Sequence, residues 1–482
     1  MIDIKDRKKI SIVILALSSL VALLPFKLGP HYVFSFSIFS FLIPIALFSS
    51  LNFIFFLLAF IFLAVLFYPI NIENASIIPW FLIFVSGVGV VSYISKKGKP
   101  IKADSFLLVL LIFSLYELFV DIFNILFHGL PSQQHFSFSN VILSIVLKPL
   151  FRFLLVATIA NIPWEEVPNK TKKKFEGFIL ICAVLAFLFA FFQYVPQKPS
   201  VLVPLLDYYI SEDRLIYYIE LPMQGYHPRV MGPFGNDNQM GVFSGLMMLF
   251  IFFLFKKRKG NIRDKLLIFL LFLMAFASLM LTQSLTAFFG IIISFLFIVA
   301  FFSFRKSSKR LINFIYLMAI GISLVPVFVF PSIFYRVHYV GEKGLGVETL
   351  VTRQQIWRFL VDNTFSDPVS IAIGKGIFFL MDPEIHEKIL GAADNEFVRV
   401  LVAYGTIGLL LFLLVFIAFL RLAKVILPPI APAKEFVLGG LLFFLIACFT
   451  GEYFSANKIG LLFLFILSFV LYSEASTTSR TR

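Results

Sequence analysis

The sequence predicts an all-α protein, a polytopic membrane helix bundle of about fourteen transmembrane helices with two large loops on the outer face. Hydrophobic residues make up 60% of the 482 residues and charged residues only 14%, whereas soluble domains contain roughly 45–50% apolar and about 25% charged residues. Apolar stretches of about 18 residues or more, enough for a helix to cross the hydrocarbon core, recur along the whole chain. They are continuous, as in residues 50–67, unlike the short alternating segments of a β-barrel.

Hydropathy places the predicted spans in chain order, and the two widest gaps between them divide the chain into five parts. The parts are seven helices over residues 1–194, a large loop over 195–237, four helices over 238–330, a second large loop or cap over 331–395, and three helices with a short tail over 396–482. The predicted spans are 10–27, 31–48, 51–69, 78–95, 105–127, 140–160, 176–194, 238–255, 265–281, 284–303, 311–330, 396–420, 435–450 and 457–473.

The formal net charge is +14, and the basic residues gather in short loops between apolar stretches. This pattern follows the positive-inside rule of membrane topology and does not indicate a nucleic-acid partner. With a cytoplasmic N-terminus and a retained first helix, every dense basic cluster falls on the cytoplasmic side, together with the C-terminus. The clusters are Lys96, Lys97, Lys99 and Lys102; Lys170, Lys172, Lys173 and Lys174; Lys256, Lys257, Arg258 and Lys259; Arg305, Lys306, Lys309 and Arg310; and Arg480 with Arg482.

Cysteine usage and acidic motifs give no indication of a metal or a cofactor. Cys182 and Cys448 both lie inside apolar stretches, so neither a disulfide framework nor a CxxC metal site is available. No DxD-like motif stands out to hold a metal ion. We therefore expect neither a metal nor a cofactor.

The two predicted outer loops, about 43 and about 65 residues long, far exceed the usual connection of a few residues, and loops of such length commonly carry function. In the second loop, residues 349–362 place Ile356, Phe359 and Leu360 at helical spacing. We expect a partly helical cap there. Several tyrosines near the first loop are expected to form an interfacial aromatic belt, with sugar stacking as the alternative: Tyr208, Tyr209, Tyr217, Tyr218 and Tyr226.

Two consecutive predicted spans carry charges inside the membrane. Glu117 and Asp121 lie four residues apart, as do Lys148 and Arg152, so each pair occupies one helix face. In an antiparallel hairpin, this spacing pairs Glu117 with Arg152 and Asp121 with Lys148. One interpretation is charge neutralisation inside the bundle. The other is that Lys148 and Arg152, beside the kinking Pro149, line a polar cavity and hold an anionic lipid headgroup.

The first long loop ends in HPRVMGPFGNDNQMG, residues 227–241, directly before an apolar span. Its glycines permit tight or positive-φ backbone, and Asn236, Asp237 and Asn238 can cap the following helix. An elaborate helix cap is one interpretation. A helix cap does not require an arginine. Arg229 instead favours an anion site, because a guanidinium beside a helix N-terminus binds phosphate well. We favour the anion site.

Two later segments complete a pattern. The second long loop contains TRQQIWRFL, residues 352–360, with Arg353 and Trp357 on one helix face, and then DNEFVRVLVAYGTIG, residues 394–408. Together the three segments, spanning roughly residues 225–420, resemble the O-antigen ligase and polymerase superfamily of bacterial envelope glycosyltransferases. The residues that match its motifs are Arg229, Gly232, Asn236 and Asn238 in the first segment, Arg353 and Trp357 in the second, and Asp394, Asn395, Gly405 and Gly408 in the third.

The sequence departs from the family at two positions. Asp394 stands where ligases of the family usually have His, which favours the polymerase branch or an Asp acting as base. In LTQSLTAFFG, residues 281–290, Leu285 replaces an expected arginine. We expect another basic residue to compensate, the candidates being Lys148, Arg152, Arg336 and Arg358.

The resemblance implies a GT-C-like fold and an inverting, metal-independent transfer of a glycan from undecaprenyl diphosphate to a sugar hydroxyl. It assigns Arg229 and Arg353 to the diphosphate and Asp394 to general-base catalysis. The remaining candidates for substrate binding are Asn236, Asn238, Asn395, Lys148, Arg152, Trp357 and Arg336. Glu396 is an alternative base, although it can instead pair with Arg399 three residues later.

The main functional hypothesis is a repeat-unit polymerase of a surface polysaccharide such as O-antigen, capsule or exopolysaccharide, in the bacterial inner membrane with its site on the periplasmic face. The donor and acceptor partners are undecaprenyl-diphosphate-linked glycans within the lipid bilayer, and a chain-length regulator and a flippase are further partners that the resemblance suggests. The nearest alternative is a ligase that transfers the glycan to lipid A core. A flippase or transporter is more distant, because it rarely needs so long an outer loop.

Overall fold

The computed structural model describes most of the helical bundle. The described residues are 51–67, 77–128, 148–194, 229–258, 262–303, 345–381, 385, 395–428, 431–454 and 457–479, and none of them forms a β-strand. The helices are α3 (Leu51–Phe67), α4 (Ile77–Lys96), α5 (Ser105–His128), α7 (Lys148–Asn161), α8 (Asn169–Tyr194), the 3-10 turn η3 (Gly232–Phe234), α11 (Asp237–Lys257), α12 (Ile262–Thr282), α13 (Leu285–Ser303), α15 (Leu345–Thr364), α16 (Pro368–Ile373), α17 (Ile377–Met381), α19 (Glu396–Ile426), α20 (Pro432–Cys448) and α21 (Asn457–Ser479).

The long helices confirm an all-helical membrane protein. Within the described ranges, α5, α8, α11, α12, α19 and α21 are long and apolar enough to cross a membrane. Each predicted span that falls on described residues coincides with one helix, whereas the predicted spans 10–27, 31–48 and 311–330 lie outside the described residues. The largest difference is at α8, which begins at Asn169 and not at residue 176, because its first turns are lysine-rich and hydropathy alone does not register them.

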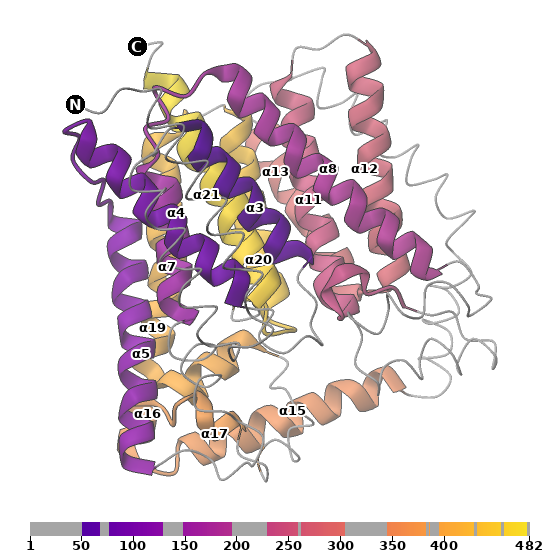
Figure 1. The fold of residues 1–482 in the computed structure, drawn as a ribbon. Coiled ribbons are helices and arrows are strands. Elements are labelled where there is room, and N and C mark those ends of the chain that lie inside the picture. Colours follow the sequence, from indigo (N-terminus) through magenta and orange to yellow (C-terminus); the bar gives the residue numbers. More distant parts are fainter. Residues whose placement is uncertain are drawn as a thin grey trace, which may run out of the picture.

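The long helices form two groups that meet along α20 and α21 (Figure 1). In one group α3, α4, α7 and α21 pack on one another, and α5 packs between α7 and α19. In the other group α11 contacts α12, α13 and α20. Phenylalanine fills much of the space between helices, as where Phe412 lies edge-on to Phe454 with ring centroids 5.2 Å apart. Dispersion contacts of this kind hold helices together where the lipid supplies no hydrophobic driving force.

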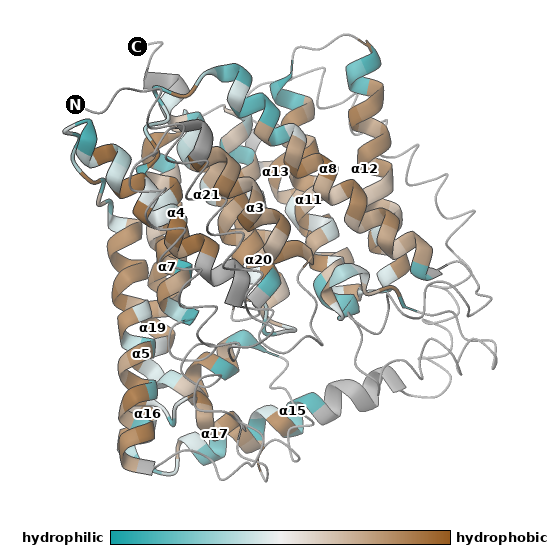
Figure 2. Cartoon of the chain, viewed as in Figure 1, coloured by the Kyte–Doolittle hydropathy of each residue, from teal (hydrophilic) through white to brown (hydrophobic). Residues whose placement is uncertain are grey.

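One end of the bundle carries the basic residues that the sequence places in its short loops. Lys257 binds both Glu176 and Glu474 at 2.5 Å, and Lys99 binds Glu166 at 2.5 Å. The hydrophilic ends of α8 and α12 lie at this same end (Figure 2). The described basic clusters therefore share one end, as the alternation of spans predicts, whereas residues 305–310 and 480–482 lie outside the described residues.

The opposite end holds the loop before α11, the start of α19 and three helices outside the main bundle. Helix α15 runs across this end in Figure 1, and α16 and α17 follow it beside α5 and α19. Ile356 and Leu360 of α15 are buried, so the predicted helix at residues 349–362 is confirmed. The motif segments that are described thus gather away from the basic end.

Candidate functional site

The loop before α11 is fixed by a glutamine from a distant helix. Gln193, near the end of α8, accepts hydrogen bonds at Oε1 from the backbone N–H groups of Met231 at 3.0 Å and Gly232 at 2.9 Å. Its Nε2 donates back to the carbonyl oxygen of Gly232 at 3.3 Å. Because Gln193 is buried, these three bonds satisfy polar groups that would otherwise be costly to bury.

The glycines and the asparagine of this loop have the conformations that the sequence predicts. Gly232 and Gly235 have φ angles of 54° and 62°, a region open to glycine but strained for other residues. Asn236 is the N-cap of α11, and its Oδ1 accepts from the N–H of Gln239 at 3.1 Å. The capping interpretation is thus correct for Asn236.

Arg229 lies between this cap and the break that separates α12 from α13. Its guanidinium forms an ion pair with Asp237, donates to Asn238 Oδ1 at 3.3 Å and donates from Nε to the carbonyl oxygen of Thr282 at 3.1 Å. The side chain is 32% exposed. The contact with Thr282 brings the first motif to the start of the segment Thr282–Ser284, where Gln283 has a positive φ of 53°. Arg229 is therefore oriented by the protein while one side faces outward.

The start of α19 contains the third motif. Asn395 caps this helix, because its Oδ1 accepts from the N–H groups of Phe397 at 2.9 Å and Val398 at 3.2 Å. Asp394 directly precedes this cap and lies outside the described residues, as does Arg336.

Of the two roles open to Glu396, the structure supports pairing with Arg399. The carboxylate is fully buried, and its Oε1 accepts from Arg399 Nε at 3.2 Å. Its Oε2 accepts from the backbone N–H of Phe454 at 3.0 Å. Both oxygens are therefore engaged within the protein, which favours the role of ion-pair partner over that of a base.

Phe454, before α21, and Lys458, in the first turn of α21, link the third motif to the first. Phe454 donates its N–H to Glu396 at the start of α19. A few residues later, Lys458 donates from Nζ to the carbonyl oxygen of Pro233 at 2.5 Å in the loop of the first motif. Asn395 and Arg229 are distant in sequence, and the contacts of Phe454 and Lys458 therefore connect the segments that carry them. Neither Gln193 nor Lys458 was among the predicted site residues, and the only sequence signal was a polar residue at the edge of an apolar span.

Of the two predicted ion pairs inside the membrane, the structure confirms one. Arg152 Nη2 donates to Glu117 Oε2 at 2.7 Å, and both residues are buried. The pairing of Asp121 with Lys148 is wrong. Asp121 Oδ1 accepts from the backbone N–H of Ile377 at 3.1 Å and Oδ2 accepts from the hydroxyl of Tyr404 at 3.4 Å. The hairpin rule failed because the outer segment at α17 supplies a donor that neither span contains.

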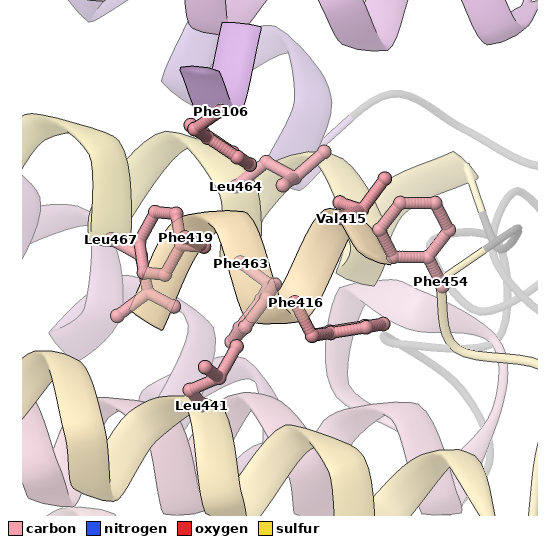
Figure 3. A pocket seen from close by; sticks show the side chains of 9 residues that line it. All are labelled: Phe106, Val415, Phe416, Phe419, Leu441, Phe454, Phe463, Leu464 and Leu467. Atoms are coloured by element: carbon pink, nitrogen blue, oxygen red, sulfur yellow. The ribbon is translucent and has the colours of Figure 1, made fainter. Parts of the chain in front are cut away.

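The buried ring of Phe454 connects this ion pair to an apolar pocket. The guanidinium carbon of Arg152 lies 4.8 Å from the centroid of the Phe454 ring, a cation–π geometry. The same ring lines a pocket between α5, α19, α20 and α21 (Figure 3). The nine side chains that line it are all apolar: Phe106, Val415, Phe416, Phe419, Leu441, Phe454, Phe463, Leu464 and Leu467.

The second motif lies on α15. Arg353 is partly exposed, and Trp357, one turn later, packs against the hydrophobic core. Helix α15 contacts α19, so Arg353 belongs to an element that lies against the helix starting after Asn395. At its end the chain turns into α16, which Asp367 caps by accepting from Ser370 N–H at 2.7 Å. Hydrogen bonding from Ser370 holds the pKa of Asp367 below its usual range.

Helix α19 is broken at Gly405, where φ is 66° and ψ is −170°. The break frees the carbonyl groups of the preceding turn, and the chain between α16 and α17 occupies them. Lys375 N–H donates to the carbonyl oxygen of Val402 at 2.9 Å and Gly376 N–H donates to that of Ala403 at 2.8 Å. Sequence reasoning missed this break, because one glycine in an apolar stretch is also compatible with a continuous helix.

Within the described part of the chain, no group of three or more His, Cys, Asp or Glu side chains is placed to hold a metal ion.

Comparison with known protein families matches residues 269–413 to the family described as O-antigen ligase. A search of curated proteins finds no match. The matched stretch runs from α12 into α19, and it contains the second and third motifs, including Arg353, Asn395 and Gly405. The first motif, with Arg229, precedes it but packs against it at Thr282. Residues 269–413 are therefore similar to the O-antigen ligase family, which is consistent with the O-antigen ligase and polymerase superfamily that the three motifs resemble.

Proposed function

We propose that the protein is an inverting, metal-independent glycosyltransferase that polymerises undecaprenyl-diphosphate-linked oligosaccharide repeat units of a surface polysaccharide. The observation that carries this proposal is the similarity of residues 269–413 to the O-antigen ligase family, in which the helix start at Asn395 is joined to the Arg229 loop through Phe454 and Lys458. In this proposal the protein lies in the bacterial inner membrane with both termini in the cytoplasm. The end that carries Arg229 and Asn395 then faces the periplasm, and the basic end faces the cytoplasm.

The proposed reaction is a single displacement at the anomeric carbon of the donor sugar. An acceptor hydroxyl attacks that carbon and forms the new glycosidic bond, while the bond from the carbon to the diphosphate oxygen breaks. Asp394 takes the hydroxyl proton, and the lipid diphosphate departs with the electron pair. Attack opposite to the leaving group inverts the configuration. Negative charge grows on the departing phosphate, so cations held at that position accelerate the step.

Arg229 and Arg353 are the proposed cations for the departing diphosphate. Arg229 is oriented by Asp237, Asn238 and Thr282, and it is partly exposed beside the N-terminus of α11, where backbone N–H groups also favour an anion. A fixed guanidinium binds phosphate with little loss of side-chain entropy. Arg353 lies on α15, an element outside the main bundle, and in this proposal the diphosphate binds between the two arginines.

The other predicted residues have supporting roles in this proposal. Asn238 contacts Arg229 directly, whereas Asn236 and Asn395 position their helices as caps. Lys148 is partly exposed and is a proposed contact of an anionic headgroup, whereas Arg152 is buried against Glu117 and contributes its charge from within the bundle. Trp357 and Arg336 complete the set as proposed contacts to the glycan or the carrier.

A ligase that transfers the glycan to lipid A core is the second candidate, because the matched family is described as O-antigen ligase. The two reactions share the donor and differ in the acceptor. Asp394 stands where ligases of the family usually carry His, and this departure favours the polymerase.

The deciding experiment supplies purified protein with a lipid-diphosphate-linked repeat unit from the source organism and resolves glycan length on a gel. We expect wild type and Arg263→Ala, a control on the exposed basic end of α12, to build a ladder. Arg229→Ala, Arg353→Ala and Asp394→Ala should lose it while remaining folded. A product that forms only when lipid A core is added would favour the ligase, and wild type inactive with both acceptors would contradict the proposal.

A further inference from the structure

We propose that Asp121 is a positioning residue that docks the outer segment 366–381 onto the break in α19 and thereby sets the position of the α15 helix, with Arg353, relative to Asn395. The placement of Asp121 follows from hydrogen bonds of the fold itself. Its consequence for transfer rests on the proposed function.

The outer segment completes the broken helix. The carbonyl oxygens of Val402, Ala403 and Tyr404, directly before the break, each accept a hydrogen bond from outside α19. The donors are Lys375 N–H at 2.9 Å, Gly376 N–H at 2.8 Å and the hydroxyl of Tyr116 at 3.1 Å. An unsatisfied backbone carbonyl in a membrane costs several kcal/mol. The break in α19 therefore depends on the outer segment, and each stabilises the other.

The contact between the outer segment and the break in α19 is called the joint. Three glycines in it allow the two backbones to lie against each other. Gly374, Gly376 and Gly405 have φ angles of 90°, 74° and 66°. A Cβ at Gly374 would lie 2.5 Å from the backbone nitrogen of Gly405, and a Cβ at Gly376 would lie 2.9 Å from the side chain of Asn124 on α5. A Cβ at Gly405 would in turn collide with the carbonyl oxygen of Ala372. Glycine at positions 374 and 405 therefore allows the outer segment to dock on the break.

Asp121 joins α5 to both halves of this joint. Its Oδ1 accepts from the N–H of Ile377, the first residue of α17, and its Oδ2 accepts from the hydroxyl of Tyr404 directly before the break. The side chain is fully buried. A buried acceptor with donors on both partners fixes their relative position, since losing it leaves a buried N–H and a buried hydroxyl unsatisfied. The hydroxyl of Tyr116, also on α5, contacts both elements as well, at the carbonyl oxygens of Ile373 at 3.5 Å and Tyr404 at 3.1 Å. Of the two side chains, Asp121 alone accepts hydrogen bonds from both elements.

The joint bears on the site because the chain between it and Arg353 is short and ordered. Helix α15 ends at Thr364, α16 begins at Pro368, and the cap formed by Asp367 closes the turn between them. On the other side of the joint, the first half of α19 leads from Gly405 back to the cap at Asn395. Displacement of the joint would therefore change the separation of Arg353 and Asn395, and misplacement by about 1 Å can cost about a hundredfold in rate.

The test compares Asp121→Leu, which removes both acceptors, with Asp121→Asn, which retains an acceptor for Ile377 N–H and a polar group beside Tyr404. Ser114→Ala is the matched control, because it removes a buried hydrogen bond between α5 and α7 at Pro149 and none at the joint. Spin labels at Gln355→Cys on exposed α15 and Ile407→Cys on α19, 43% exposed, report the distance between the helices by pulsed electron paramagnetic resonance. Cys182 and Cys448 are replaced by alanine in every variant.

We expect a narrow distance distribution in wild type, Asp121→Asn and Ser114→Ala, and a shifted or broadened one in Asp121→Leu. In the ladder assay, without labels, Asp121→Leu should lower kcat by roughly tenfold or more with little change in KM, and Asp121→Asn should restore most of the rate. Tyr404→Phe, which removes one of the two bonds and leaves no cavity, should show a smaller change in the same direction if the leucine variant does not fold.

An unchanged distance distribution in both Asp121→Leu and Tyr404→Phe would overturn the proposal. A changed distribution with an unchanged kcat would overturn the part that concerns transfer. If wild type transfers glycan to no acceptor, the proposed function fails, and the distance distribution alone still decides whether Asp121 docks the outer segment.

Discussion

Lys458, the second residue of α21, donates a hydrogen bond from Nζ to the carbonyl oxygen of Pro233 in the loop that precedes α11. The lysine is buried and meets a backbone group 225 positions away in sequence. A buried lysine is rare within a membrane protein, because removing its amine from water costs free energy, and it marks a functional or architectural requirement. Here it holds the loop that carries Arg229, which makes Lys458 the first position to test.

Replacing Lys458 by methionine should destabilise the protein by about 1–3 kcal/mol, because the carbonyl of Pro233 loses its partner while remaining buried. Thermal unfolding in detergent measures the effect. Lys424→Met, on the exposed face of α19, is the control and should leave the unfolding temperature unchanged. An unaltered unfolding temperature in Lys458→Met would show that the contact contributes nothing to the loop.

Gln193→Leu should lower stability by about 2 kcal/mol or more, because two backbone N–H groups and one carbonyl of the Arg229 loop lose their partner. Gln193→Glu keeps the acceptor for Met231 and Gly232, so its loss should be smaller. Urea or thermal unfolding with glycan transfer measured in parallel checks this order. Equal losses in the two variants would contradict the assignment of Oε1 as the main anchor.

Removing either member of the Glu117 and Arg152 pair should cost about 3–5 kcal/mol, since an uncompensated charge remains buried. Glu117→Leu combined with Arg152→Met should recover most of this loss. A double-mutant cycle on unfolding free energies measures the coupling. Additive single losses would mean that the two side chains do not act as a pair.

Gly405→Ala should destabilise the protein by about 1–3 kcal/mol, because φ is positive there and a Cβ would collide with the carbonyl group of Ala372. Gly177→Ala is the control, since that helical glycine has open space where its Cβ would lie. The control should be neutral or stabilise by about 0.5–1 kcal/mol. Unfolding temperatures that rank the two variants in the opposite order would rule out the close approach at the break.

The carboxylate of Glu166, in the turn between α7 and α8, has a pKa lowered by hydrogen bonds from Lys99 and Tyr93. A carboxyl whose folded pKa is depressed stabilises the fold above its unfolded pKa, and this contribution is lost as the pH falls through the folded pKa. Glu166→Gln should therefore be slightly less stable than wild type at pH 7, with the difference shrinking toward about pH 3. Unfolding temperatures across this range provide the test. A difference that grows in acid would reverse the sign of this linkage.

Hydropathy was sufficient to place the described membrane-spanning helices, apart from the lysine-rich first turns of α8, because each of these spans contains a long apolar stretch. It also predicted that the described basic clusters share one end of the bundle. The caps at Asn236 and Asn395 could be predicted as well, since an asparagine before a helix accepts hydrogen bonds from N–H groups a few residues ahead. These features depend on local sequence alone.

The contacts that assemble the site could not be predicted in this way. Lys458 with Pro233 and Gln193 with Gly232 join segments whose proximity follows only from the packing of several helices. Asp121 was assigned to Lys148 by a rule for two adjacent helices, whereas its partner Ile377 belongs to a third element. The roles of Arg229, Arg353 and Asp394 in transfer remain predictions for the ladder assay.

The break at Gly405 also divides α19 into two parts with different surroundings. The part of α19 after Gly405 is an apolar helix whose length must match the thickness of the surrounding lipid. Such helices tilt when the bilayer becomes thinner or thicker. Val402 and Ala403, before the break, are bound through their carbonyl oxygens to Lys375 and Gly376 in the chain between α16 and α17. We therefore expect a change of lipid length to tilt the part of α19 after Gly405 more than the part before it, which the outer segment holds.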